Sequence, residues 1–177
     1  MKSIQDEKKG IVLIGMPAVG KSTIGVILAK IMGYHFLDSD ICIQEQEGML
    51  LSDIIEQKGI QEFLDIEEKV NQNIPLKGTI LATGGSAVYG KKAMEYFQKN
   101  AIIIYLQEEF DVLESRLSNI KGRGVVFKEG QSLFELFRER VPLYEGFAHI
   151  TIFEKSRGPE ETILDIQEEL NDYLKTK

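Results

Sequence analysis

The sequence predicts an α/β fold, a three-layer sandwich in which a five-stranded parallel sheet carries helices on both faces. Short apolar runs alternate along the chain with stretches of helical periodicity, and parallel strands need such crossover connections. The apolar runs contain few polar residues, as in strands buried on both faces. The 177 residues suffice for one domain with a full core but are short for two, so we expect a single domain over 1–177.

The first strand is expected over 11–14, where a β-rich apolar run stops at a glycine. A helix should follow over 22–32, because isoleucine and leucine recur there on one helical face. Gly33 stands where a helix C-cap is expected. The next apolar run, 35–37, predicts the second strand.

A long acidic stretch, about 41–75, has a helical pattern that is interrupted at Gly48 and Gly59. Charged residues on such helices usually face solvent. We therefore interpret its paired glutamates as solvated helix faces: Glu45, Glu47, Glu67 and Glu68.

The second half of the chain repeats the alternation of strand and helix. Further strands are expected at 79–82, 101–106 and 149–153, with helices around Leu113, over 132–147 and at the C-terminal end. Residues 119–130 are glycine-rich, basic and without apolar periodicity. They are predicted to form a mobile loop.

The composition excludes several classes of function. A net charge of −7 argues against a nucleic-acid partner, which would need a basic face. The single cysteine, Cys42, can form neither a disulfide framework nor a thiolate metal site. The charged N-terminus lacks the apolar run of a signal peptide, and no stretch is long enough to span a membrane. We expect a cytoplasmic protein without a membrane partner.

A phosphate-binding loop is the strongest motif. "GMPAVGKS" at 15–22 matches G-x-x-x-x-G-K-[ST], whose backbone N–H groups surround phosphate oxygens while the lysine reaches the β- and γ-phosphates and the hydroxyl binds Mg²⁺. A chance match in a glycine turn is the alternative, but the strand before and the helix after favour the motif. ATP and Mg²⁺ are therefore expected as cofactors. The expected ATP-binding residues here are Gly15, Ala18, Val19, Gly20, Lys21, Ser22 and Thr23.

Three segments resemble the shikimate kinases, and the resemblance covers nearly the whole chain. They are "GMPAVGKSTIGVILAKIMGYHFLDSDICIQEQEG" from 15, "LATGGS" from 81 and "RERVPLYEGFA" from 138. The resemblance implies a nucleoside-monophosphate-kinase-like fold with a mobile lid at about 119–130 and an acceptor-binding helical region at about 41–75. It also implies phosphorylation of shikimate, a step of aromatic amino-acid biosynthesis, by a monomer.

The resemblance assigns roles to two aspartates at the end of the second strand. Asp38 would hold Mg²⁺ through water, and Asp40 would face the acceptor hydroxyl and take its proton. Residues two apart in an extended segment lie on the same side, which suits this pairing. The alternative for Asp40 is a purely structural N-cap of a helix that begins at Ile41.

Further positions follow from the same resemblance. The acceptor would be contacted by Gly84, Gly85 and Ser86, where the family has a third glycine, and its carboxylate by Arg140. Arg123 would be the catalytic lid arginine that spreads transition-state charge. Arg116 and Arg157 would frame adenine. The alternative for the loop at 84–86 is a plain strand-to-helix turn. The alternative for Arg116, Arg123 and Arg157 is a solvated charge on the surface.

The chain departs from the family at Leu64. The family has an arginine directly after a phenylalanine there, as a second contact to the substrate carboxylate. A charge-assisted arginine–carboxylate contact contributes roughly 1.5–3 kcal/mol to binding. Because this chain lacks the second arginine, the sequence leaves the identity of the phosphate acceptor open. The candidates are shikimate in a rearranged site, another small acceptor such as a polyol or an amino-bearing acid, and a non-catalytic nucleotide-binding module.

Overall fold

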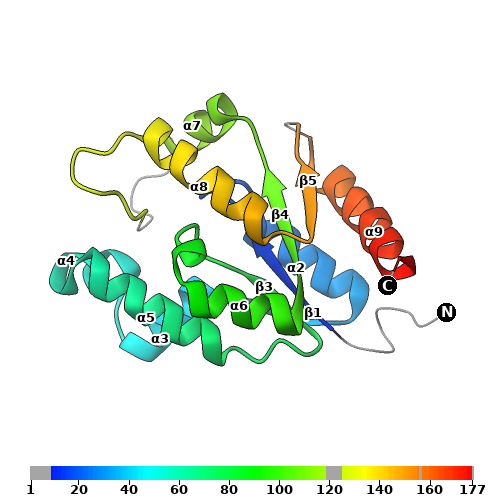
Figure 1. Ribbon diagram of the computed structural model, residues 1–177, viewed down its shortest axis with the longest axis horizontal. Coiled ribbons are helices and arrows are strands. Elements are labelled where there is room, and N and C mark those ends of the chain that lie inside the picture. The colour runs from blue at the N-terminus through cyan, green and yellow to red at the C-terminus, as the bar shows by residue number, and fades with distance from the viewer. Residues whose placement is uncertain (1–8, 119–124, 156, 177) are drawn as a thin grey trace.

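The computed structural model describes residues 9–118, 125–155 and 157–176. Five parallel strands form one sheet in the order β2-β3-β1-β4-β5 (Figure 1). This arrangement confirms the predicted α/β class. The strands are β1 (Gly10–Ile14), β2 (His35–Asp38), β3 (Thr79–Ala82), β4 (Ala101–Gln107) and β5 (Ile150–Phe153).

Helices cover both faces of the sheet. α2 and α9 lie on one face, while α6 and α8 lie on the other, and α3, α4 and α5 form a separate helical region at one end (Figure 1). The helices are α2 (Lys21–Met32), α3 (Ser39–Glu47), α4 (Leu51–Lys58), α5 (Ile60–Asn73), the 3₁₀ helix η1 (Ala87–Tyr89), α6 (Lys91–Asn100), α7 (Phe110–Ser118), α8 (Leu133–Phe147) and α9 (Pro159–Lys175).

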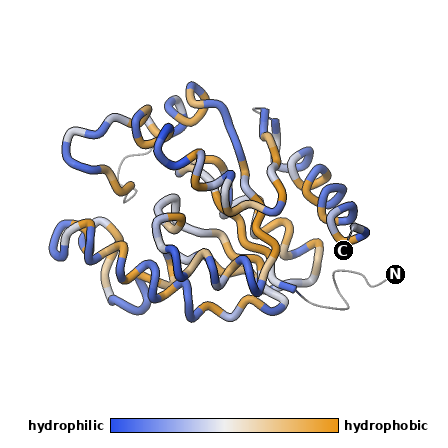
Figure 2. The backbone as a smooth tube through the Cα atoms, in the orientation of Figure 1, coloured by the Kyte–Doolittle hydropathy of each residue, from blue (hydrophilic) through white to orange (hydrophobic). Residues whose placement is uncertain are grey.

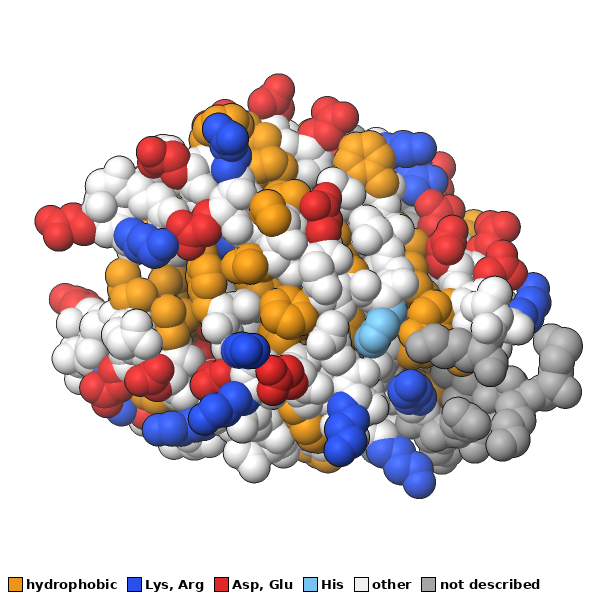
Figure 3. Space-filling view, in the orientation of Figure 1, with side chains coloured by type: hydrophobic (Ala, Val, Ile, Leu, Met, Phe, Trp, Pro, Cys, Tyr) orange, Lys and Arg blue, Asp and Glu red, His pale blue; other side chains and the backbone are white. Residues whose placement is uncertain are grey.

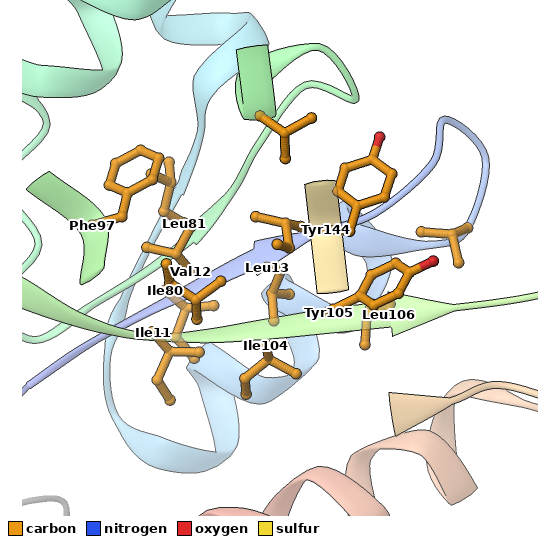
Figure 4. Close-up of a cluster of buried hydrophobic side chains, with 14 of the residues drawn as sticks. Ile11, Val12, Leu13, Ile80, Leu81, Phe97, Ile104, Tyr105, Leu106 and Tyr144 are labelled. Carbon is orange, nitrogen blue, oxygen red and sulfur yellow. The ribbon is translucent and has the colours of Figure 1, made fainter. Parts of the chain in front are cut away.

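The core is centred on the three inner strands. Every residue of β1 and β3 is buried, and all of β4 except its last residue. In Figure 2 these strands form the hydrophobic centre, with hydrophilic segments outside it. Tyr105 of β4 stacks on Tyr144 of α8 with ring centroids 5.1 Å apart (Figure 4). Because each fully buried large apolar side chain contributes about 1.5–3 kcal/mol, this centre holds the strand ends that carry the site.

The element predictions hold with two omissions. All five strands are confirmed, with ends that shift by one residue at most, and the acidic stretch divides into α3, α4 and α5 at Gly48 and Gly59, as expected. The sequence reasoning did not identify η1 and α6, although Met94 and Phe97 of α6 show helical spacing and are buried. None of the helices in the described ranges is long and apolar enough to cross a membrane.

Candidate active site

A cavity of about 800 Å³ opens at the carboxyl ends of β1, β2 and β3. Lining residues come from the loop after β1, from the junction of β2 and α3 with its two aspartates, from the glycines after β3, and from α7 and α8, which supply Arg116 and Arg140. Carboxyl ends of parallel strands meet at one edge of the sheet, which is where α/β proteins bind ligands. The fold thus brings together residues that are far apart in the sequence.

The loop after β1 has the backbone that a phosphate-binding loop requires. Gly15 has φ +146°, and a Cβ there would lie 2.5 Å from the Leu106 carbonyl oxygen, so only glycine fits. Gly20, with φ +109°, is the N-cap of α2, whose N-terminal end carries a positive partial charge. Lys21 is 8% exposed, and its Nζ donates to the carbonyls of Gly15 and Met16, both at 2.8 Å.

The candidate metal position lies between Ser22 and Asp38. The Ser22 hydroxyl donates to Asp38 Oδ2 at 2.6 Å, and Asp38 Oδ1 accepts from the Asp40 amide at 3.0 Å. A hydroxyl and a carboxylate at this distance suit Mg²⁺, which binds one or two such protein groups and keeps waters and phosphate oxygens. No cluster of three or more metal-ligating side chains occurs in the parts of the chain that the structure describes.

Asp40 is not the cap of its helix. α3 begins at Ser39, and its N-cap is Asp38, whose side chain accepts from the Asp40 amide. The alternative in which Asp40 caps a helix starting at Ile41 is therefore wrong. Asp40 instead lines the cavity, as a residue that meets an acceptor should.

Two hydrogen bonds hold the Gly84-Gly85 loop beside Asp40. The Gly84 amide donates to Ser39 Oγ at 3.0 Å, and the Tyr144 hydroxyl donates to the Gly85 carbonyl at 2.6 Å. A Cβ on Gly84 would lie 2.7 Å from Asp40 Oδ1, and one on Gly85 would lie 2.9 Å from Arg140 Nη1. Both glycines therefore allow charged side chains to reach the loop backbone.

Arg140 is almost completely buried, at 1% exposure. Its Nε donates to the Tyr89 hydroxyl at 3.2 Å, and its Nη2 donates to the Val126 carbonyl at 3.0 Å. The guanidinium carbon also lies 5.2 Å from the centre of the Tyr89 ring, within the range of a cation–π contact. The structure thus places a buried positive charge in the wall of the cavity, beside Gly85.

Glu67 of α5 corrects the interpretation of the glutamates as solvent-exposed. It is 2% exposed, and a Cβ on Gly84 would lie 2.6 Å from its Oε1. Burial raises the pKa of Glu67 to about 7; the Asp40 charge adds to this, while a hydrogen bond from Ser86 and the charges of Arg140 and Lys21 oppose it. The sequence signal was available, since position 67 lies on the same helical face as the buried Phe63 and Val70.

This raised pKa predicts a pH-dependent stability. In the unfolded chain Glu67 loses its proton near its ordinary pKa of 4.5, whereas in the folded protein it does so near 7. As the pH rises from about 4.5 to about 7, the free energy of unfolding should therefore fall by on the order of 3 kcal/mol. Because Glu67→Gln removes this loss, its melting temperature should exceed that of wild type by more at pH 8 than at pH 5. Glu68→Gln is the control, and a gain independent of pH would contradict the assignment.

The remaining predicted residues lie in different places. Arg116 lines the cavity, with Nη1 donating to the Ala18 carbonyl at 3.4 Å and Nη2 3.5 Å from Glu108. Arg157 is not among the residues that line this cavity. It pairs with Asp165 and donates to two backbone carbonyls at the end of β5, those of Phe153 and Glu154. Arg123 lies outside the described residues.

Leu64, the position at which the chain departs from the family, lies next to a residue that lines the cavity. Leu64 is half-buried on α5 and does not line the cavity in the described structure, but its neighbour Phe63 does. Apolar side chains also come from the other wall, where Val125 and Val126 lead toward α8. On the left of Figure 3, hydrophobic side chains gather between the segment that leads into α8 and the region of α4.

A phosphate loop, an aspartate pair at the end of the next strand and a buried arginine facing one cavity define the class of P-loop phosphotransferases. The family model described as shikimate kinase matches residues 17–171. The chain belongs to the shikimate kinase family, enzymes that transfer phosphate from ATP to a hydroxyl group.

Curated relatives and solved structures agree with this membership. The chain is 30% identical to the shikimate kinase of Dehalococcoides mccartyi over 96% of this chain and 97% of that one. It is 36% identical to that of Thermodesulfovibrio yellowstonii over 77% and 81%. The structure of a shikimate kinase from Acinetobacter baumannii in complex with shikimate superposes with a TM-score of 0.82 at 30% identity, covering 99% of both chains.

Proposed function

We propose that this protein transfers the γ-phosphate of ATP to a hydroxyl of shikimate, giving shikimate 3-phosphate. The observation that carries the proposal is the convergence of Lys21, Asp40, the Gly84-Gly85 loop and the buried Arg140 on one cavity. The resemblance of the whole chain to a shikimate kinase in complex with shikimate supports the choice of acceptor. A cytoplasmic location and a monomeric state stay predictions.

We assign each step of the transfer to a residue of the chain. The P-loop amides and Lys21 would bind the β- and γ-phosphates, and Arg140 would bind the substrate carboxylate in a charge-assisted pair. Asp40 would orient the acceptor hydroxyl and take its proton as the hydroxyl oxygen bonds to the γ-phosphorus and the bond to the β-phosphate oxygen breaks. Ser22 and Asp38 would hold Mg²⁺, which neutralises phosphate charge when bound. By the resemblance, Arg123 would add a positive charge over the phosphates.

The proposal is tested by ADP release with a panel of acceptors. The panel should contain shikimate, gluconate, homoserine and simple polyols, each with ATP and Mg²⁺. We expect the highest kcat/KM with shikimate. A higher value with a neutral polyol or an amino-bearing acid would favour the second candidate, a related kinase, for which the apolar Leu64 is the specific observation. ATP binding without turnover of any acceptor would favour a non-catalytic module.

Replacing Leu64 with arginine should strengthen shikimate binding. A second arginine beside the carboxylate should lower the KM for shikimate by about ten-fold or more. The kcat should change little, because the carboxylate is remote from the transferred phosphate. Leu64→Met, which keeps the size and adds no charge, is the matched control.

The direction of the change separates the candidates. If the native acceptor is neutral or carries an amine, an unpaired guanidinium beside it should raise its KM. An unchanged KM on every acceptor would mean that residue 64 does not reach the bound substrate.

A further inference from the structure

The wall of the cavity beyond Asp40 comes from α3 and the start of α4 and is mostly apolar. Its residues are Ile41, Gln44, Leu50, Leu51 and Ser52. In a ligand site with apolar walls, the few polar groups fix the orientation of the ligand. Gln44 and Ser52 supply the polar side chains of this wall, and the transfer as proposed uses neither.

Gln44 lies one helical turn after Asp40, on the same face of α3. Side chains four positions apart on a helix are neighbours, with Cβ atoms about 5–6 Å apart. Both residues line the cavity, and Asp40 is proposed to hold the hydroxyl that is phosphorylated. An acceptor bound at Asp40 therefore has Gln44 as its next polar neighbour along this helix.

The start of α4 sets the orientation of the Gln44 side-chain amide. The Leu51 backbone N–H donates to Gln44 Oε1 at 3.3 Å. This N–H belongs to the first turn of α4, where amides have no partner within the helix. Because a backbone N–H can only donate, it holds the oxygen end of the side chain and leaves the NH₂ end for another partner.

The NH₂ group of Gln44 is available to a ligand. Gln44 is half-buried, and its Nε2 has no hydrogen-bond partner within the ranges that the structure describes. The Ser52 hydroxyl already donates to Asp53 Oδ1, at 3.4 Å. On α5, Leu64 supplies no donor. A polar group of the acceptor that turns toward this wall therefore meets the Gln44 amide.

The carboxylate of shikimate has a suitable separation from the phosphorylated hydroxyl. One ring carbon lies between the two carbons that carry these groups, a distance comparable with one helical turn between side chains. A buried carboxylate needs several donors. Arg140 can supply only part of them, because its Nε and Nη2 already donate to Tyr89 and Val126.

We propose that Gln44 is a specificity-determining residue whose side-chain NH₂ group donates a hydrogen bond to the carboxylate of the phosphate acceptor. This inference rests on the proposed function and extends it. The carboxylate is then held by a charged donor from α8, Arg140, and a neutral donor from α3, Gln44. In this chain the amide takes a place that needs no arginine at residue 64.

The test measures KM and kcat for shikimate in two variants. Gln44→Met keeps the length of the side chain and removes the donor, so KM should rise by about ten-fold, as for a lost hydrogen bond to a charged group. Gln44→Glu brings a second negative charge to the carboxylate, so its KM should rise further. In both variants kcat should stay within about two-fold of wild type, because the carboxylate is remote from the transferred phosphate.

The carboxamide of shikimate identifies the group that Gln44 contacts. Its NH₂ group can donate to a carboxylate at position 44, whereas shikimate cannot. The preference for shikimate over the carboxamide, measured as the ratio of KM values, should therefore fall by about ten-fold or more in Gln44→Glu. Any loss at Arg140 is common to wild type and variant and cancels in this comparison.

Stability separates a ligand contact from a structural role. Gln44→Glu keeps an oxygen for the Leu51 amide, and a negative charge is favourable at the start of α4, so its melting temperature should be at least that of wild type. The matched controls are Gln46→Met and Gln46→Glu. Gln46 is exposed on α3 and donates to Glu47 at 3.3 Å, and both controls should keep the wild-type KM.

Four results would overturn the inference. An unchanged KM in both Gln44 variants, with normal turnover of shikimate, would leave the proposed function intact. A lower melting temperature of Gln44→Met with a wild-type KM in Gln44→Glu would make Gln44 only a cap of α4. An equal rise of KM for shikimate and its carboxamide in Gln44→Glu would place the contact elsewhere on the acceptor. Wild-type protein that turns over no panel acceptor would refute the proposed function as well.

Discussion

Replacing Lys21 with alanine should remove nearly all phosphoryl transfer while leaving the fold intact. Lys21 lines the cavity at the start of α2, and its ammonium group is the P-loop charge closest to the phosphates by the motif. Stabilising charge on the transferred phosphate is the main source of catalysis in this class. We expect kcat to fall by well over ten-fold in an ADP-release assay.

The control for this variant is Lys30→Ala, which removes an exposed lysine from the same helix. Its kcat should equal that of wild type. Circular dichroism and melting temperature should show that both variants fold. If Lys21→Ala kept more than about a tenth of the wild-type kcat, its assignment to the phosphates would be refuted.

The second large effect is expected for Asp40→Asn. The amide keeps the shape of the side chain but cannot take the proton of the acceptor hydroxyl, so kcat should fall by about 100-fold or more. The stability of α3 should not change, because its N-cap is Asp38 and not Asp40. The KM for the acceptor should change much less than kcat.

Asp65→Asn provides the comparison, since Asp65 is exposed on α5 and accepts only from Gln61 among the described residues. Single-turnover kinetics with saturating ATP would separate the chemical step from product release. A wild-type rate of the chemical step in Asp40→Asn would assign the proton to another group.

Much of the fold could be predicted because its strands are short apolar runs with clear ends. The run before Gly15 becomes β1, and Gly48 and Gly59 divide the acidic stretch because both have positive φ, at 68° and 83°. The helix α6 was not predicted because its apolar residues are few, and its buried face is defined by packing against α5, β4 and η1.

Residues of the candidate site could be predicted only where they belong to a recognisable sequence motif. The P-loop spacing identified Lys21 and Ser22, and the family resemblance identified Asp40 and Arg140. Glu67 was assigned to solvent, because a glutamate among charged neighbours on a helix is usually exposed. Which face of α5 turns inward depends on how α5 packs on η1 and α6, and that arrangement involves residues distant in sequence.

The anchoring of Arg140 has a consequence for ligand affinity. A free arginine side chain has many rotamers, and fixing it costs up to about 2 kcal/mol of conformational entropy. Here Tyr89, Val126 and the surrounding burial already fix it before any ligand arrives. That entropy loss belongs to folding rather than to association. A carboxylate that binds Arg140, as proposed, would therefore meet a preorganised guanidinium, and a larger part of the contact energy would appear as affinity. Preorganisation of one arginine therefore offsets part of what a second, mobile arginine would contribute.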